Sequence, residues 1–196
     1  MWGFSEKAVN ELATLLRTRT RSLHEAVEQL LYTPAMQAGQ LTAGQYNHLL
    51  RVHYLFHSDL EAAIDQHAAR FASYDPDSRR KTPALLADFD TLRETPPVTK
   101  SAGMQAWLPD ALLGAAYVSE GSMLGITMVG PMLRKNPALA DLTDAMHFYA
   151  GYGPDTGRHW KAFGQLLATV PPDRYDAVLA GADAAFRRYQ QLSLRC

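Results

Sequence analysis

The sequence has a single cysteine among its 196 residues, and that cysteine, Cys196, is the last of them. One thiol cannot form an internal disulfide, so the fold has to be held by its core, and we expect a reducing, cytoplasmic setting. A Cys-x-x-Cys pair, a glycine-rich phosphate loop and a Gly-x-Ser-x-Gly elbow are also missing. The sequence therefore offers no motif for dithiol, nucleotide-dependent or serine-hydrolase chemistry.

An excess of charge of either sign is lacking as well. Lysine and arginine number 19 against 20 acidic residues, which gives a net charge of −1. Nucleic-acid-binding proteins usually show a strong basic excess, so we expect no nucleic-acid partner. The first residues lack the basic region and apolar core of a secretory signal. Residues 111–133 come nearest to a membrane span, but Glu120 would cost several kcal/mol there, so we expect no membrane segment.

No stretch alternates between apolar and polar residues in the way of a half-buried strand. Helical periods dominate instead. A chain of this length suits one domain, which buries about 70% of its unfolded surface. We therefore predict an all-α fold of about seven helices, with residues 1–196 forming one domain around a single core.

Capping residues and prolines set the expected helix ends. Ser5 is placed to cap a first helix that ends before Thr33 and Pro34. The run from Thr42 to Gln45 has the form of a capping box and opens a helix that continues to about Arg70. Later helices are expected over 83–93 with Thr82 as cap, from Pro109 to Asn136 with a weak point at Gly130 and Pro131, over 138–149, from a cap at Thr156, and from Pro172 to about Leu192.

Two glycines, Gly121 and Gly125, lie four residues apart inside the expected helix that begins at Pro109. Each costs about 0.8–1 kcal/mol relative to alanine, and the two share one helix face. Something must therefore approach this face more closely than a methyl group would allow. Either a neighbouring helix packs there or a flat ligand does.

A histidine stands among charged residues on the first expected helix. Arg17, Arg21, His24 and Glu28 fall near one face. Such a stripe is often a set of solvated ion pairs. Alternatively, His24 binds a haem iron, Glu28 orients its ring, and the arginines reach the haem propionates. A ring held between His24 and the glycine face would explain both features, with Tyr117 flanking it.

Three further potential metal ligands, His53, His57 and Glu61, recur every four residues. This spacing could form a metal site, but di-iron bundles use repeated Glu-x-x-His pairs, which this chain lacks. We expect these histidines to be partly buried among apolar neighbours. The basic run 79–81 is expected to be a solvated loop, or alternatively a docking point for an acidic electron donor.

Three blocks of sequence, at 15–28, 113–125 and 148–160, together resemble the haem oxygenases, and in particular the soluble bacterial branch often found beside bacteriophytochromes. The first carries a basic lead into His-x-x-x-Glu, and the second reads Tyr-Val-Ser-Glu-Gly-Ser-Met-Leu-Gly. The third is an aromatic, Tyr-Gly, Thr-Gly and Trp segment. The resemblance covers about residues 12–190 and implies the all-α haem oxygenase fold.

The resemblance implies a role for each matching residue. His24 would be the proximal iron ligand supported by Glu28, and Arg17 and Arg21 would lie near the haem propionates. The backbone of the two distal glycines would lie over the haem. The residues assigned to the distal side are Gly121, Ser122 and Gly125, and the further haem contacts are Tyr117, Phe186 and, as weaker propionate candidates, Arg158 and Lys161.

Two positions depart from the family pattern. Ser122 stands where many members carry an aspartate that anchors the distal water network, so proton delivery must use other groups. Ile126 stands where glycine or alanine is usual, and its branched side chain could crowd the haem or rotate it.

The implied activity is oxidative cleavage of haem, as both substrate and cofactor, to biliverdin, carbon monoxide and ferrous iron. It uses O₂ and an external electron donor such as a ferredoxin, a flavodoxin or a reductase, and a bacteriophytochrome is an expected acceptor of biliverdin. Three alternatives stay open. They are a homologue that binds haem to sequester or sense it, a helical enzyme of the thiaminase-like or quinone-cofactor fold, and a helical interaction module.

Overall fold

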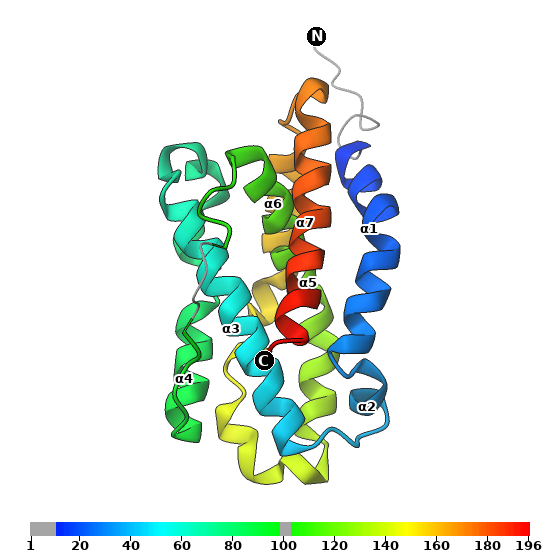
Figure 1. Ribbon diagram of the computed structural model, residues 1–196, viewed down its shortest axis with the longest axis vertical. Helices are drawn as coiled ribbons and strands as arrows, with labels where there is room; N and C mark the ends of the chain where they lie inside the picture. The colour runs from blue at the N-terminus through cyan, green and yellow to red at the C-terminus, as the bar shows by residue number, and fades with distance from the viewer. Residues whose placement is uncertain (1–10, 99–102) are drawn as a thin grey trace.

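A computed structural model describes residues 11–98 and 103–196 (Figure 1). Within these ranges the chain forms helices and no strand, so the predicted all-α fold is confirmed. The α-helices are α1 (Glu11–Leu30), α2 (Thr33–Gln37), α3 (Ala43–Asp65), α4 (Thr82–Leu92), α5 (Pro109–Arg134), α6 (Thr156–Leu167) and α7 (Tyr175–Ser193). Short 3₁₀ helices join them: η2 (Ala68–Arg70), η3 (Ala72–Tyr74), η4 (Pro76–Arg79), η5 (Pro137–Ala145), η6 (Phe148–Ala150), η7 (Gly153–Asp155) and η8 (Pro172–Arg174).

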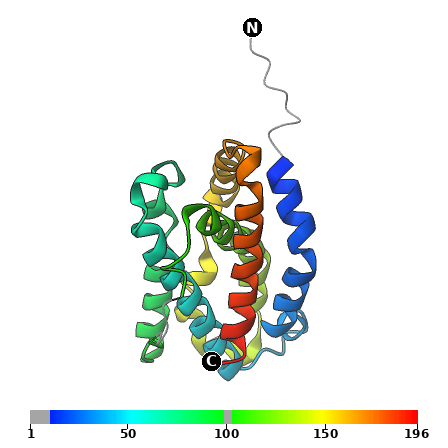
Figure 2. The ribbon, with the colours of Figure 1, turned by 45° about the horizontal axis from the view of Figure 1, so that its top comes forward.

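The helices α5 and α7 form the centre of the bundle. Helix α1 packs along one side of α7, α3 crosses its other side, and α4 lies beyond α3 (Figures 1 and 2). Apolar side chains gather in two clusters at the two halves of α5. One joins α5 to α1, α6 and α7, and the other joins it to α2, α4 and η5.

Glycines allow α5 and α7 to approach closely. A Cβ atom built on Gly114 would overlap the carbonyl oxygen of Val178, and one built on Gly181 would overlap the backbone of Ala111. Only residues without a side chain fit at these two points. The bare backbone at each crossing therefore sets the distance between the two central helices.

The capping box at the start of α3 is confirmed. Gln45 donates its backbone N–H to the Thr42 hydroxyl over 3.2 Å, and the Thr42 N–H donates to the Gln45 side-chain oxygen over 2.9 Å. Helix α3 ends at Asp65 and not at about Arg70, because the chain tightens there into the 3₁₀ turns that follow. Ser5, the expected cap of the first helix, lies outside the described residues.

Thr82 and Thr156 were expected to cap helices, and both predictions are wrong. Each threonine is the first residue of its helix, and the residue before it forms no side-chain cap hydrogen bond. At α4, Glu61 of α3 does this work, since its Oε1 accepts the N–H groups of Lys81 and Thr82 over 2.6 and 3.2 Å. The Thr156 hydroxyl donates instead to the Gly153 carbonyl.

The helix expected over 138–149 is present as the 3₁₀ helices η5 and η6 and not as an α-helix. The buried carboxylate of Asp88 accepts the backbone N–H groups of His147 and Phe148 over 2.6 and 2.9 Å. Those two N–H groups are thus taken by a side chain of α4. An α-helix would need them for its own carbonyls.

Helix α1 ends before Pro34 and helix α5 ends before Pro137, as expected. Pro34 occupies the first turn of α2, a position where proline needs no N–H partner. Pro131 lies inside α5, which continues to Arg134. At this turn Gly130 lies so close to the Tyr149 carbonyl that an added Cβ would stand 2.6 Å from its oxygen. This tertiary contact holds the turn despite the proline.

Helix α5 is long and apolar enough, by length and composition alone, to cross a membrane. More than half of its most apolar window, 56%, is buried inside the protein. A helix at the centre of a bundle needs apolar residues on several faces, so the packing of α5 explains its composition.

Candidate active site

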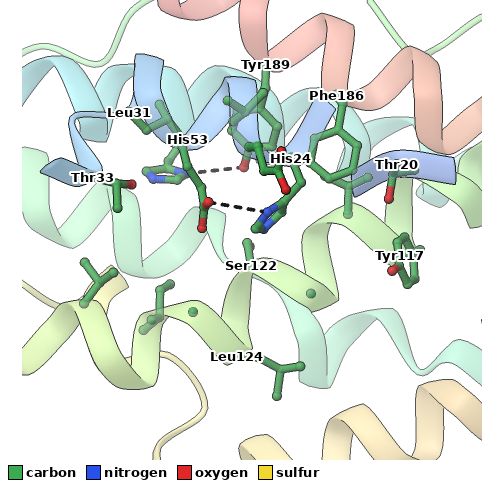
Figure 3. Close-up of a pocket in the computed structure, with 18 of the residues that line it drawn as sticks. Thr20, His24, Leu31, Thr33, His53, Tyr117, Ser122, Leu124, Phe186 and Tyr189 are labelled. Carbon is green, nitrogen blue, oxygen red and sulfur yellow. Dashed lines mark hydrogen bonds and ion pairs between the residues drawn. The ribbon is translucent and has the colours of Figure 1, made fainter. Parts of the chain in front are cut away.

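A cavity of about 680 Å³ separates α1 from α5 (Figure 3). Its volume lies in the range of small-molecule and cofactor sites. Helices α1 and α5 form its two long walls, and residues of α2, α3, α6 and α7, with Tyr149, close its ends.

On the α1 wall, His24 extends toward α5 (Figure 3). Its Nδ1 atom lies 3.7 Å from Oε2 of Glu28, one turn later on the same helix. The edge of its ring packs on Phe186 of α7, with 5.9 Å between the ring centroids. The His24 side chain is 56% exposed, so the imidazole is held by its neighbours and still open to a ligand. Arg17 and Arg21 line the same wall.

On the α5 wall, Gly121 and Gly125 present bare backbone to the cavity. A Cβ atom built on either glycine would meet no heavy atom of a neighbouring element within 4 Å in the part of the chain that the structure describes. The alternative in which another helix packs on these glycines is therefore wrong. The Ser122 hydroxyl, between them, donates to the Ser119 carbonyl over 2.7 Å, so its proton is engaged by its own helix.

Aromatic side chains close the end of the cavity near the start of α6. Tyr117 of α5 lies with its ring centroid 6.0 Å from that of Trp160. Burial raises the pKa of the Tyr117 hydroxyl above its ordinary value, and a hydrogen bond with Thr20 and the charge of Arg17 oppose this rise. Both opposing groups belong to α1, so Tyr117 reaches across from α5 to the other wall. Trp160 also lines the cavity, although the sequence did not indicate that it contacts a ligand.

A chain of buried hydrogen bonds, not foreseen from the sequence, leads away from the cavity. His53 Nδ1 lies 3.3 Å from the Tyr189 hydroxyl, which lies 3.3 Å from His57 Nε2. His57 Nδ1 in turn lies 3.3 Å from the Ser119 hydroxyl. His53 and Tyr189 line the cavity, and His57 and Ser119 lie behind them. We call these four residues the buried polar chain.

Burial keeps both histidines of the buried polar chain neutral. It lowers the pKa of His53 to about 3 and that of His57 well below its ordinary value. The alternative of a metal site formed with Glu61 is wrong, since no group of three or more His, Cys, Asp or Glu within residues 11–98 and 103–196 could hold a metal ion. Glu61 caps α4 instead.

The structure gathers most of the predicted site residues in this cavity. They are Arg17, Arg21, His24, Glu28, Tyr117, Gly121, Ser122, Gly125 and Phe186, and Ile126 joins them. Arg158 is not among the described residues that line it. Its guanidinium pairs with Asp155 over 3.1 Å on the exposed side of α6, and Lys161 also lies outside.

The basic run 79–81 is not a solvated loop. Arg79 and Lys81 are 6% and 4% exposed, and both pair with the carboxylate of Glu120. Arg80 pairs with two aspartates at the surface. The docking interpretation of this run therefore loses two of its three cations.

The cavity fits a haem. Backbone without side chains at Gly121 and Gly125 leaves an open face that a flat ring can approach, and an imidazole stands on the opposite wall (Figure 3). Cations at Arg17 and Arg21 suit the carboxylates of a porphyrin. The rest of the lining is mainly apolar and aromatic, which suits the ring itself.

Comparisons with known proteins agree with this geometry. The family model described as Heme oxygenase matches residues 10–195. A curated protein named heme oxygenase, from Xanthomonas campestris pv. campestris (strain 8004), is 30% identical over 158 residues, which are 79% of this chain and 92% of that protein.

Two solved structures share the fold. The NO- and CO-bound heme oxygenase of Neisseria meningitidis superposes with a TM-score of 0.76 at 23% identity, over 94% of this chain and 90% of that one. The heme oxygenase of Leptospira interrogans superposes with a TM-score of 0.77 at 19% identity, over 94% and 99% of the two chains.

Proposed function

The chain belongs to the haem oxygenase family, and on this basis we propose that it cleaves haem oxidatively to biliverdin, carbon monoxide and ferrous iron. One observation carries the proposal: His24 and the bare backbone of Gly121 and Gly125 line opposite walls of one cavity. The protein's part in this reaction is to bind, orient and protonate.

We assign His24 as the iron ligand. Glu28 Oε2 lies 3.7 Å from Nδ1, so Glu28 would favour the proton on that nitrogen and Nε2 would be the atom that binds the metal. Phe186 packs on the ring and restricts its rotation. Arg17 and Arg21 would bind the propionates, because guanidinium groups form paired hydrogen bonds with carboxylates. When bound, haem supplies the redox-active iron and is also the molecule that is cleaved.

The α5 wall gives this site its character. Peptide backbone at Gly121 and Gly125 allows the ring to come closer than any side chain would permit. The two glycines also place no acidic side chain and no imidazole against the ring. The polar hydroxyl nearest to the glycines, that of Ser122, already donates to the Ser119 carbonyl. Protons must therefore reach the cavity from another group.

We propose that the buried polar chain supplies them. A neutral imidazole has one donor and one acceptor nitrogen, and a phenol can donate and accept at once. The hydrogen bonds from His53 through Tyr189 to His57 and Ser119 can therefore all reverse direction together. A reversal passes one proton from Ser119 toward His53, and no buried charge is left when Ser119 takes up a proton from outside the chain as His53 releases one to the cavity.

The remaining requirements are iron, O₂ as co-substrate and an external source of electrons. We propose a ferredoxin, a flavodoxin or a reductase as donor, a bacteriophytochrome as acceptor of biliverdin, and the cytoplasm as the place of action. These proposals come from the likeness to the soluble bacterial branch.

Adding hemin to the purified protein and then ascorbate under air tests the function. We expect the Soret band to form, to decay after ascorbate, and to be replaced by the red absorbance of biliverdin. In His24→Ala the normal axial ligation should be lost, while His48→Ala, outside the cavity, should behave as wild type. A Soret band that stays stable in the wild type would contradict turnover and favour a haem-sequestering protein.

A further inference from the structure

Glu120 of α5 is a buried carboxylate with four hydrogen-bond donors. Its Oε1 accepts from Lys81 Nζ over 2.6 Å, from the Tyr152 hydroxyl over 2.9 Å and from the Tyr74 hydroxyl over 3.0 Å. Its Oε2 accepts from Arg79 over 2.5 Å. Glu120 is 2% exposed, so these partners replace water completely. We call these five residues the Glu120 cluster.

The Glu120 cluster joins several parts of the fold to one point of α5. Tyr74, Arg79 and Lys81 belong to the segment between α3 and α4, and Tyr152 precedes α6. Arg79 also donates to the carbonyl of His159 on α6, and the Lys81 N–H donates to Glu61 of α3. A shift of α5 at Glu120 would therefore strain contacts with both α3 and α6.

That point of α5 lies directly behind the cavity wall. Glu120 precedes Gly121 in the helix, yet it is not among the described residues that line the cavity. At Gly121 and Gly125 the wall has no side chain that could hold it in place, since the space over both glycines is open. Elsewhere, α5 is located by close backbone contacts at Gly114 and Gly130. Between these two contacts the Glu120 cluster holds α5 in place.

Two cations, Arg79 and Lys81, face the single carboxylate of the cluster. Burial alone would raise the pKa of Glu120, but Lys81 and Arg79 outweigh this effect and hold it below its ordinary value. Burial lowers the pKa of Lys81, and the Glu120 charge opposes that. Buried ion pairs of this kind contribute little net stability compared with well-packed apolar residues. Such a cluster is better explained by its effect on geometry, because its hydrogen bonds fix the position of α5.

We propose that Glu120 is a positioning residue, which through Arg79 and Lys81 fixes the place of the Gly121–Gly125 backbone over the bound ring. This inference rests on the proposed function, because it concerns the wall of the same site. It assigns Glu120 no contact with haem. Its consequence is that loss of the cluster alters the glycine side of the cavity and leaves the His24 side intact.

The test compares five proteins: the wild type, Glu120→Gln, the conservative Glu120→Asp, the milder Tyr152→Phe, and the control Asp59→Asn. Asp59 is also a buried carboxylate, which accepts the Met104 N–H over 2.9 Å, but it belongs to α3 and lies outside the cluster. The control therefore measures the effect of weakening a buried polar contact as such. Three quantities are measured: hemin affinity, azide affinity of the ferric haem complex, and amide hydrogen exchange of the apoprotein.

We expect all five proteins to bind hemin with the same axial ligation. Azide, which binds on the glycine side, should change its affinity about tenfold in Glu120→Gln and about threefold in Tyr152→Phe, because small displacements at a binding site have large effects. Exchange over residues 118–126 should speed up in both variants. Asp59→Asn should match the wild type in these two readouts, and Glu120→Asp should restore part of the loss.

The proposal is overturned if Glu120→Gln and Tyr152→Phe keep wild-type azide affinity and exchange, or if Asp59→Asn changes both readouts as much as they do. If Glu120→Gln does not fold, Tyr152→Phe decides the question. A wild type that binds haem without degrading it would contradict the proposed function, while azide affinity and exchange would still decide the role of Glu120.

Discussion

Gly114 on α5 lies directly against the carbonyl oxygen of Val178 on α7, with no room for a Cβ atom between them. Gly121, two turns later on the same helix, has open space at the corresponding point. The glycines of α5 thus serve two purposes, which the sequence alone does not separate. One allows two helices to meet, and the other leaves a cavity wall bare.

The two kinds of glycine should respond in opposite ways to alanine. Gly121→Ala should stabilise the apoprotein by about 0.5–1 kcal/mol, because alanine favours the helix and meets no neighbour. It should also weaken haem binding and slow turnover, because the methyl group enters the cavity. Gly114→Ala should destabilise the protein by about 1–3 kcal/mol through overpacking. Urea unfolding and hemin titration of both variants measure these effects, and unchanged haem binding and turnover in Gly121→Ala would contradict the assignment of the wall.

The arginines of the site differ in their expected contribution to haem binding. Arg17→Ala and Arg21→Ala should each weaken hemin affinity about tenfold, the effect of one charge-assisted hydrogen bond. Arg158→Ala is the matched control, since its guanidinium pairs with Asp155 outside the cavity. Its hemin affinity should stay within about twofold of the wild type, because exposed ion pairs contribute little. A larger loss in Arg158→Ala than in Arg21→Ala would show that the propionates lie elsewhere.

The buried histidines should make stability depend on pH. Burial lowers the pKa of His53 to about 3, whereas an unfolded histidine titrates near its ordinary value of 6.5. Between these values the unfolded chain binds more protons than the folded one, so stability falls as pH falls from about 6.5 toward 3. His53→Gln removes this titrating group, so its free energy of unfolding, measured in urea, should fall less between pH 7 and pH 5 than that of the wild type. The difference between the two proteins should reach up to about 1.4 kcal/mol per pH unit. Parallel curves for the two proteins would refute this.

Removing one hydroxyl should break the buried polar chain. Tyr189→Phe deletes the group between His53 and His57, while the ring stays stacked on Phe56, with 3.8 Å between their centroids. We expect unchanged hemin affinity and a rate of biliverdin formation lower by about tenfold to a hundredfold, the effect of losing positioned proton transfer. Single-turnover kinetics in H₂O and D₂O measure this. A wild-type rate in the variant would exclude the buried polar chain as the route of protons.

Features that depend on neighbours along the chain could be predicted from the sequence. The capping box at Thr42 and Gln45 is formed within four residues, and it is present as expected. Thr82 gave a similar local signal and failed, because Glu61 from α3 accepts the N–H groups that a cap would take. The stretch 138–149 is helical as expected, but it forms 3₁₀ helices, and Asp88 of α4 binds two of its backbone N–H groups.

The site shows the same division. His24 and Glu28 lie on one helix, and so do the two glycines of the wall. Helical spacing in the sequence was therefore enough to predict that each pair shares a face. The buried polar chain and the Glu120 cluster each draw their members from three segments, so helical spacing connects only His53 and His57 and not the remaining members. Arg158 failed as a candidate because the face of α6 on which it lies points away from the cavity.

A crystal structure of the complex with hemin tests the central claim most directly. The account predicts iron bonded to Nε2 of His24, with the opposite face of the ring against the backbone of Gly121 and Gly125. A haem bound through another residue, or lying away from the two glycines, would contradict it.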